Sequence, residues 1–288
     1  MSKVKHGYTP TSDPCGKPPG PARADTPNPA AAYPGQMPAT PSPADLLTRA
    51  LTTDPARPFL TFYDDSTGER VELSVITFEN WVAKTANLIQ DELALEPGSR
   101  VAILLPPHWQ GQVWLQACWA AGVVPVVGAD ALAAVADCEV AVADLDSVET
   151  ARACPGERVA LSLRPLGAPL TEPVPGFLDY AAAVRVHGDR FDACQPVTAD
   201  SPALYAKGRA WNGGEVVGYV ERLIADEEWG AGSRVLTTSD LGTARTVATG
   251  LLAPLSVDGS IVLCRHLDQA GLDRRIAAER VTRVTETT

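Results

Sequence analysis

Short apolar runs alternate with amphipathic segments along the chain from Ala44 onward. A continuous apolar run bounded by turn residues is typical of a buried strand, and apolar positions three and four residues apart are typical of a helix. The predicted strands are 59–63, 71–74, 100–105, 123–127, 140–143, 159–163, 203–206, 234–237 and 260–264. The predicted helices are 44–52, 77–95, 110–121, 216–224, 241–252 and 268–280, with Thr77 as the N-cap of the second. Strands that alternate with helices form βαβ units, so the pattern predicts an α/β fold with parallel sheets flanked by helices.

The segment 164–201 is the least regular part of this pattern and is rich in Pro and Gly. Clusters of these residues between periodic segments are typical of connections. We therefore expect one α/β layer at about 44–163, a linker at about 164–201 and a second layer at about 202–288. No repeat of fixed period divides the chain further.

The first 43 residues differ in composition, because they contain eleven of the 25 prolines of the chain. Large aliphatic side chains are almost absent from residues 8–43, so this segment cannot bury enough apolar surface to offset the entropy of ordering it. We expect residues 1–43 to form a disordered tail. Met37 is the second of only two methionines, and we expect it to be the native start of the protein.

The chain is acidic, with 24 basic and 35 acidic residues, a net charge of −11 and a sequence pI near 4.8. The tail holds four basic and two acidic residues, which leaves 20 basic and 33 acidic residues for 44–288. Binding to nucleic acid and docking on anionic lipid both depend on clustered Lys and Arg. We therefore expect neither nucleic acid nor a membrane as a partner.

The cysteines are scattered, without a CxxC pair or a Cys/His spacing of the kind that binds zinc. They are Cys15, Cys118, Cys138, Cys154, Cys194 and Cys264. We expect reduced and mostly buried thiols. No apolar region of the signal-peptide type follows Met1, and no apolar run reaches the roughly 20 residues that a transmembrane helix needs. These features predict a cytoplasmic protein.

Parallel α/β sheets bind ligands at the carboxyl ends of their strands, so the turns after the predicted strands are the places to expect chemistry. The sequence contains no GxxxxGK[ST], GxGxxG, GxSxG or HExxH motif. Asp144 and Asp146 are a pair that can hold a divalent metal, but without a phosphate motif beside them we favour a solvated loop. His108 also follows a strand, and we favour a surface residue over a general base. Trp114 lies at helical spacing with apolar neighbours, which favours packing in the core. No catalytic residue and no metal site is predicted.

The turn after the predicted strand 203–206 has a distinctive sequence. It reads Tyr205-Ala206-Lys207-Gly208-Arg209-Ala210-Trp211-Asn212-Gly213-Gly214. Three glycines and two cations between a predicted strand and a predicted helix are typical of an anion-binding nest. A flexible loop with solvated charges explains the same residues, so both interpretations stay open.

Three longer stretches resemble the adenylate-forming superfamily, which includes the acyl-CoA synthetases. They are VITFENWVAKTANLIQDELALEPGSRVAILLPPHWQ, QACWAAGVVPVVG and RVLTTSDLGTARTVATGLLAPLSVDGSIVLCRHLD. In the family a hairpin leads into a long helix and a strand, a helix ending in Ala-Gly precedes a Val-Pro strand, and a Leu-Leu-x-Pro-Leu segment precedes a Gly-containing turn and strand. The stretches follow the order of the family and span most of the chain from Ala44, so the chain resembles the first half of the N-terminal domain of that superfamily.

The resemblance implies that the turn at Tyr205 corresponds to the phosphate loop of the family, Tyr-Thr-Ser-Gly-Thr-Thr-Gly-x-Pro-Lys-Gly. Only Tyr205 and Gly208 match that loop. The positions that differ are Ala206, Lys207, Arg209 and Ala210 for the hydroxyl residues, Trp211 for the second glycine and Gly214 for the lysine. Since Lys207 and Arg209 restore positive charge, the candidate nucleotide-binding residues are Tyr205, Lys207, Gly208 and Arg209.

The adenine-binding, metal-binding and ribose-binding motifs of the family, and its catalytic lysine, lie beyond the family position that matches Thr288. The resemblance therefore implies a truncated relative that has lost the adenylation machinery, and we expect a non-catalytic binding or interaction module without a cofactor. One alternative is an enzyme that still binds ATP or AMP with Mg²⁺, or an acyl substrate, and is completed by another subunit. Another is an unrelated small-molecule enzyme that uses His108.

A sheet register built for a longer chain leaves strand edges uncovered. Because exposed edges are commonly blunted or paired, we expect a homodimer or a protein partner.

Overall fold

The computed structural model describes residues 40–285, apart from the side chain of Leu166, and all of them belong to the compact unit Met37–Thr288. The predicted start at Met37 and most of the predicted tail lie outside the described residues. Residues 40–43 are described, and they differ from the prediction because they lead into a helix. Ser42 is buried and exchanges hydrogen bonds with Asp45 at the start of α1 (Pro43–Thr53).

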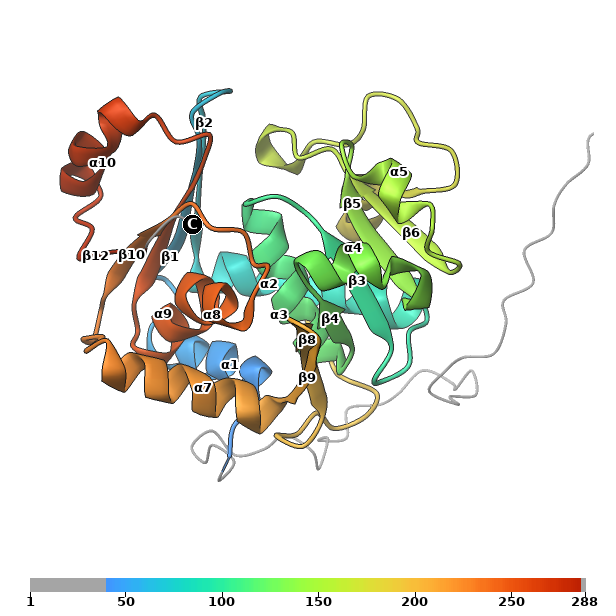
Figure 1. Cartoon of the computed structure of the whole chain (residues 1–288), viewed down its shortest axis with the longest axis horizontal. Helices are drawn as coiled ribbons and strands as arrows, with labels where there is room; N and C mark the ends of the chain where they lie inside the picture. The colour runs from blue at the N-terminus through green and yellow to red at the C-terminus, as the bar shows by residue number, and fades with distance from the viewer. Residues whose placement is uncertain (1–39, 286–288) are drawn as a thin grey trace, which may run out of the picture. The chain divides into compact units, whose positions relative to one another are not determined.

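The described residues form two mostly parallel β-sheets flanked by helices, which confirms the predicted fold class (Figure 1). The five-stranded sheet has the order β12-β10-β11-β1-β2, and the seven-stranded sheet has the order β7-β6-β5-β3-β4-β8-β9. Only β2 and β9 run antiparallel to their neighbours. The strands are β1 (Pro58–Asp64), β2 (Glu69–Ser74), β3 (Arg100–Leu104), β4 (Val124–Val126), β5 (Val140–Asp144), β6 (Glu157–Leu161), β7 (Leu178–Asp179), β8 (Pro202–Ala206), β9 (Arg209–Asn212), β10 (Arg234–Thr237), β11 (Ser260–Arg265) and β12 (Arg283–Val284).

The chain crosses between the two sheets instead of finishing one before starting the other. β1 pairs in parallel with β11, in the register Leu60↔Ile261, and β8 pairs in parallel with β4, in the register Val126↔Tyr205. The N-terminal hairpin therefore completes the sheet made mainly from the end of the chain, and the β8–β9 hairpin completes the other sheet. This differs from the predicted division into a layer at 44–163 and a layer at 202–288, because both sheets take strands from both ranges.

Helix α3 (Trp109–Ala121) lies between the two sheets, together with α1, α2 (Val75–Asn87), α8 (Ala244–Val247) and α9 (Ala253–Ser256) (Figure 1). All residues of α3 except Ala120 are buried. Trp114 is fully buried, which confirms its predicted place in the core. The remaining α-helices are α4 (Ala129–Ala133), α5 (Val148–Ala151), α6 (Tyr180–Ala183), α7 (Gly213–Asp226) and α10 (Leu272–Ala278).

The predicted helix starts at residues 77 and 241 are wrong by about a turn, because a different hydroxyl residue caps each helix. The side chain of Ser74 accepts a hydrogen bond from the Thr77 amide, so α2 begins at Val75 and Thr77 is not its N-cap. Thr243 caps α8 and accepts a hydrogen bond from the Thr246 amide, so residues 241–243 remain a loop. That loop reaches the other sheet, where Gly242 meets Gly128.

The predicted linker 164–201 is irregular, but it packs closely against α2. Tyr180 is 1% exposed, and its hydroxyl lies 2.7 Å from the hydroxyl of Thr85. Lys84 donates a hydrogen bond to the backbone oxygen of His187 at 2.6 Å. The segment is therefore part of the folded unit, and β7 forms one edge of the seven-stranded sheet.

Five free cysteines occur in the described part of the chain, and all except Cys194 are buried. Cys15 lies outside it. No helix in residues 40–285 combines the length and the apolar character needed to cross a membrane.

Candidate functional site

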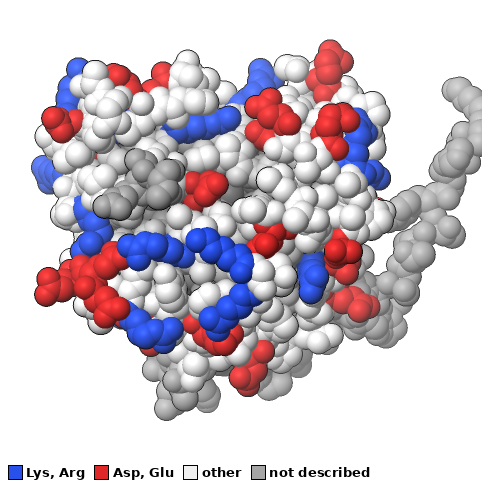
Figure 2. Space-filling view, viewed as in Figure 1, with Lys and Arg blue, Asp and Glu red and all other residues white. Residues whose placement is uncertain are grey.

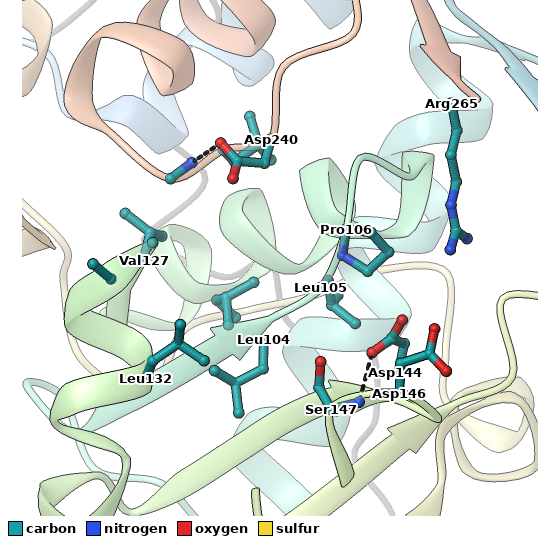
Figure 3. Close-up of a pocket in the computed structure, with 15 residues that line it drawn as sticks. Leu104, Leu105, Pro106, Val127, Leu132, Asp144, Asp146, Ser147, Asp240 and Arg265 are labelled. Atoms are coloured by element: carbon teal, nitrogen blue, oxygen red, sulfur yellow. Dashed lines mark hydrogen bonds between the residues drawn. The ribbon is translucent and has the colours of Figure 1, made fainter. Parts of the chain in front are cut away.

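A cavity of about 500 Å³ opens at the carboxyl ends of β3, β4 and β5, where the loop after β10 and the end of β11 approach from the other sheet (Figure 3). This is the edge at which parallel sheets bind ligands. Its walls are apolar at Leu104, Leu132 and Leu241. Its polar groups come from both sheets and are Asp144, Asp146, Ser147, Asp240 and Arg265.

Asp144 is the most buried of these polar groups. The residue is 6% exposed, and Ser147 is its only side-chain hydrogen-bond partner within residues 40–285, through a 3.1 Å bond from the Ser147 amide to Oδ1. Burial raises the pKa of Asp144, and the nearby charge of Asp146 adds to that rise. The predicted solvated loop is therefore wrong for Asp144, although Asp146 is exposed. No group of three or more His, Cys, Asp or Glu side chains able to hold a metal ion occurs in the described region.

Arg265 lies at the end of β11, and its guanidinium points down the cavity wall toward Asp144 and Asp146 (Figure 3). The positive charge of Arg265 acts on Asp144 and lowers its pKa, against the effect of burial. The guanidinium itself makes no hydrogen bond or ion pair to any other side chain in the described part of the structure. Arg265 and the buried carboxylate of Asp144 thus face the same cavity without forming an ion pair with each other.

Two glycines bring the sheets together along the opposite wall. Gly128 follows β4 with φ +65°, and a Cβ atom at this position would overlap the backbone oxygen of Gly242, which follows β10. Both glycines line the cavity, so no side chain separates the two sheets there. Asp240 lies on the same loop as Gly242 and accepts a hydrogen bond from its amide at 3.1 Å.

His108 is buried, and the predicted surface position is wrong. It is 2% exposed, and its ring packs edge-on against Phe62 at a centroid distance of 4.6 Å. Nδ1 accepts a hydrogen bond from the Gln110 amide at the start of α3, and Nε2 has no partner among the described residues. Burial, together with the charge of Arg265, lowers the pKa of His108 to about 3. The geometry assigns His108 the part of a neutral helix cap and not of a solvent-facing base.

The turn that contains the predicted binding residues is a tight β-hairpin. Lys207 and Gly208 have φ values of +51° and +69°, which are typical of a two-residue type I′ turn. Ala206 pairs with Arg209 across the turn, and β9 continues the ladder to Asn212. The Gly208 amide donates to the carboxylate of Asp130 at 2.9 Å. The predicted step from strand directly to helix is therefore interrupted by β9, and the segment is neither an open nest nor an irregular loop.

The hairpin separates the two predicted cations. Arg209 pairs with Glu215 at 2.9 Å and stacks on Trp211 at 3.8 Å. Lys207 lines a second cavity, of about 210 Å³, together with Thr243 and Arg245. Figure 2 shows basic side chains gathered around a hollow over α7 and the hairpin.

The other two predicted residues have positions that follow from the same hairpin. The backbone oxygen of Tyr205 accepts a hydrogen bond from Val127, and its ring lies 5.4 Å from the guanidinium of Arg100. Gly208 occupies the second turn position and is exposed. Tyr205 and Gly208 thus shape the hairpin, and Lys207 alone of the four lines the second cavity.

Sequence reasoning missed Asp240 and Arg265, which the fold brings to the cavity. Both residues follow or end strands that the apolar pattern predicts, so the rule that ligands bind at carboxyl ends applied to them as well. What the pattern could not give was the pairing of the sheets that places these strand ends opposite Asp144.

The fold is the one found in acyl-CoA ligases. The structure is similar to an acyl-CoA synthetase from Brucella canis (TM-score 0.70, 15% identity, 87% of this chain and 48% of that one). It is also similar to a benzoate CoA ligase from Burkholderia xenovorans LB400 (TM-score 0.66, 18% identity, 84% of this chain and 49% of that one). The chain thus spans about half the length of these enzymes, and at this identity the likeness is one of fold.

A closer relative defines the family. The chain is 44% identical over 247 residues to a TIGR03089 family protein of Mycobacterium tuberculosis, across 83% of this chain and 96% of that protein. The chain belongs to the TIGR03089 family. No protein-family model matches the sequence.

Proposed function

We propose that this protein is a small-molecule-binding protein that uses the fold of acyl-CoA ligases but does not form acyl adenylates. The closed β8–β9 hairpin carries the proposal. In the resembling enzymes this turn is a phosphate loop, whereas here the ladder with β9 and the bond to Asp130 occupy backbone groups of the turn. A site for phosphate oxygens needs amides that are free and directed at the ligand. The cavity of about 500 Å³ is of the size that small-molecule sites commonly have.

Adenylation needs the carboxylate of the acid held in line with the α-phosphate of ATP and the developing charge stabilised. The direct test is therefore to incubate the full chain with ATP, Mg²⁺ and acetate, hexanoate or benzoate, and to measure pyrophosphate exchange. Calorimetry with ATP and with AMP measures binding alone. We expect neither exchange nor micromolar binding. Pyrophosphate exchange with any of these acids would overturn the proposal.

A second candidate function is supported by the smaller cavity beside the hairpin. Lys207, Thr243 and Arg245 surround it, and Lys207 has no ion-pair partner within residues 40–285. This arrangement suits an anionic group, so an enzyme that binds a nucleotide or an acyl substrate here and is completed by another subunit is the alternative. It predicts thermal stabilisation by ATP that Lys207→Ala removes and Arg209→Ala retains, because Arg209 is already paired with Glu215. The first candidate predicts no stabilisation in either case.

A homodimer or a protein partner remains part of the proposal. Among the described residues the sheets have four edge strands. β7 and β12 are only two residues long, and β2 and β9 carry charged residues, so all four are poor templates for strand addition. A partner would more readily cover exposed apolar side chains such as Leu145 and Val186. Size-exclusion chromatography with light scattering tests this, and a monomer at every concentration would count against a homodimer. The free thiols are consistent with the reducing cytoplasm in which we place the protein.

A further inference from the structure

The larger cavity has a polar end whose groups complement one another but do not bind one another. Asp144 is only 6% exposed, and the hydrogen bond from Ser147 leaves part of the acceptor capacity of the Asp144 carboxylate unused. Arg265 faces the same space with a guanidinium that has no protein partner among residues 40–285. A single group that both donates and accepts hydrogen bonds, placed between this buried carboxylate and the half-buried guanidinium, would satisfy both of them.

The charges of the lining decide against an anion in that gap. Asp144, Asp146 and Asp240 provide three carboxylates against the one guanidinium of Arg265. A carboxylate head group placed beside Asp144 would bring two like charges together in a site where burial already disfavours ionisation. An ammonium head group would donate to Asp144, but it has no acceptor for the Arg265 guanidinium and is repelled by that charge, whereas a neutral group with a carbonyl oxygen serves both residues.

The rest of the cavity is suited to an apolar body. Leu104, Leu132 and Leu241 form its walls, and Leu132 is 57% exposed although it is a large apolar residue. Covering such a side chain with an apolar ligand removes its surface from water, which favours binding.

We infer that this cavity binds an uncharged amphiphile whose head group donates to Asp144 and accepts from Arg265, such as a primary carboxamide on an alkyl chain. The inference rests on the proposed ligand-binding function and names the class of ligand. The names of the similar enzymes suggest carboxylic acids as ligands, whereas we expect this cavity to discriminate against a free carboxylate.

The test uses three probes with one chain and three head groups. Hexanamide, hexanoate and hexylamine are titrated into the full-length protein at pH 7.5 without ATP, by calorimetry or ligand-observed NMR. We expect hexanamide to bind at least about ten-fold more tightly than either charged probe. Because ATP is absent, a failure here leaves the question of adenylation untouched, and pyrophosphate exchange decides that question separately.

Two variants assign the effect to the polar pair. Asp144→Asn removes the charge but keeps an acceptor for the Ser147 amide, so the preference for hexanamide over hexanoate should fall at least about five-fold. Arg265→Gln should weaken hexanamide binding. Asp226→Asn and Arg274→Gln, at exposed positions outside the cavity, are the matched controls and should change neither value. If Asp144→Asn does not fold, Asp240→Asn removes a charge from the same cavity and should reduce the discrimination against hexanoate.

Three results would overturn the inference. They are hexanoate binding as tight as hexanamide binding, hexanamide binding that survives both Asp144→Asn and Arg265→Gln, and no binding of any of the three probes.

Discussion

Gly128 and Gly242 meet backbone to backbone at the wall of the larger cavity, so that a Cβ atom on Gly128 would overlap the carbonyl oxygen of Gly242. The two residues belong to different sheets, since one follows β4 and the other follows β10. Gly128 also has φ +65° and ψ −140°, a conformation that side chains other than glycine strongly resist. The contact therefore fixes how closely the strand ends of the two sheets approach.

Gly128→Ala should lower the free energy of unfolding by about 3 kcal/mol or more, because it combines backbone strain with a clash against main-chain atoms that cannot move away. Gly230→Ala is the matched control. A Cβ atom there meets nothing within 4 Å, and its φ is not positive. Urea denaturation of both variants measures the difference, and equal stabilities would show that the sheets can move apart at this wall without cost.

Substitutions at the two central positions of the β8–β9 turn should change the free energy of unfolding in opposite directions. Lys207 occupies a left-handed conformation at φ +51°, which Asn adopts more readily than Lys, so Lys207→Asn should raise the free energy of unfolding by about 0.5 kcal/mol. Gly208→Ala should lower it by about 1 kcal/mol, because alanine at φ +69° is strained. Thermal unfolding of the two variants is the measurement. A destabilised Lys207→Asn variant would contradict the type I′ geometry.

The sequence pattern predicts local structure well wherever strands are continuous apolar runs. β5 reads Val-Ala-Val-Ala-Asp and is buried throughout, so its position follows from the apolar pattern, and it ends one residue beyond the predicted strand 140–143. β9 gives no such signal, because Arg-Ala-Trp-Asn is an exposed edge strand without an apolar run. Its turn also lacks the Asn-Gly pair that most strongly indicates a hairpin.

The pairing between distant segments could not be predicted from the pattern. β1 and β11 are about 200 residues apart in sequence, and a parallel pair has no turn between its strands to reveal it. For the same reason the sequence pattern does not point to Arg265, because its place opposite Asp144 depends on the arrangement of the two sheets. The burial of His108 was equally hidden, since a histidine after two prolines carries no mark of its surroundings.

The hydrogen bond between Tyr180 and Thr85 tests whether the irregular segment 164–201 unfolds with the rest. The Thr85 hydroxyl also donates to the Trp81 carbonyl at 2.7 Å, so its oxygen accepts from Tyr180. Tyr180→Phe should therefore lower the free energy of unfolding by about 1 kcal/mol. Adding Thr85→Val gives a double-mutant cycle with a coupling energy of similar size. If the variant showed a separate unfolding transition of residues 164–201 and kept its global stability, this segment would not unfold together with the rest of the protein.

His108 should make the protein less stable at mildly acidic pH. In the unfolded chain histidine has a pKa near 6.5, whereas burial lowers the pKa of His108 to about 3 in the folded protein. Between those values the unfolded state binds a proton that the folded state does not, so stability is full above the unfolded pKa and falls as the pH decreases toward 3. The wild-type protein should lose about 2 kcal/mol between pH 7.5 and pH 5 from this residue alone.

The variant His108→Asn keeps an N-cap acceptor for the Gln110 amide and removes the titration. Between pH 7.5 and pH 5 the free energy of unfolding of the variant should therefore fall by about 2 kcal/mol less than that of the wild type. The variant has the other three histidines, His6, His187 and His266, in common with the wild type, so the difference between the two urea-unfolding series isolates His108. Parallel series would mean that the folded protein protonates His108 as readily as the unfolded chain does, and that its ring nitrogen Nε2 reaches water.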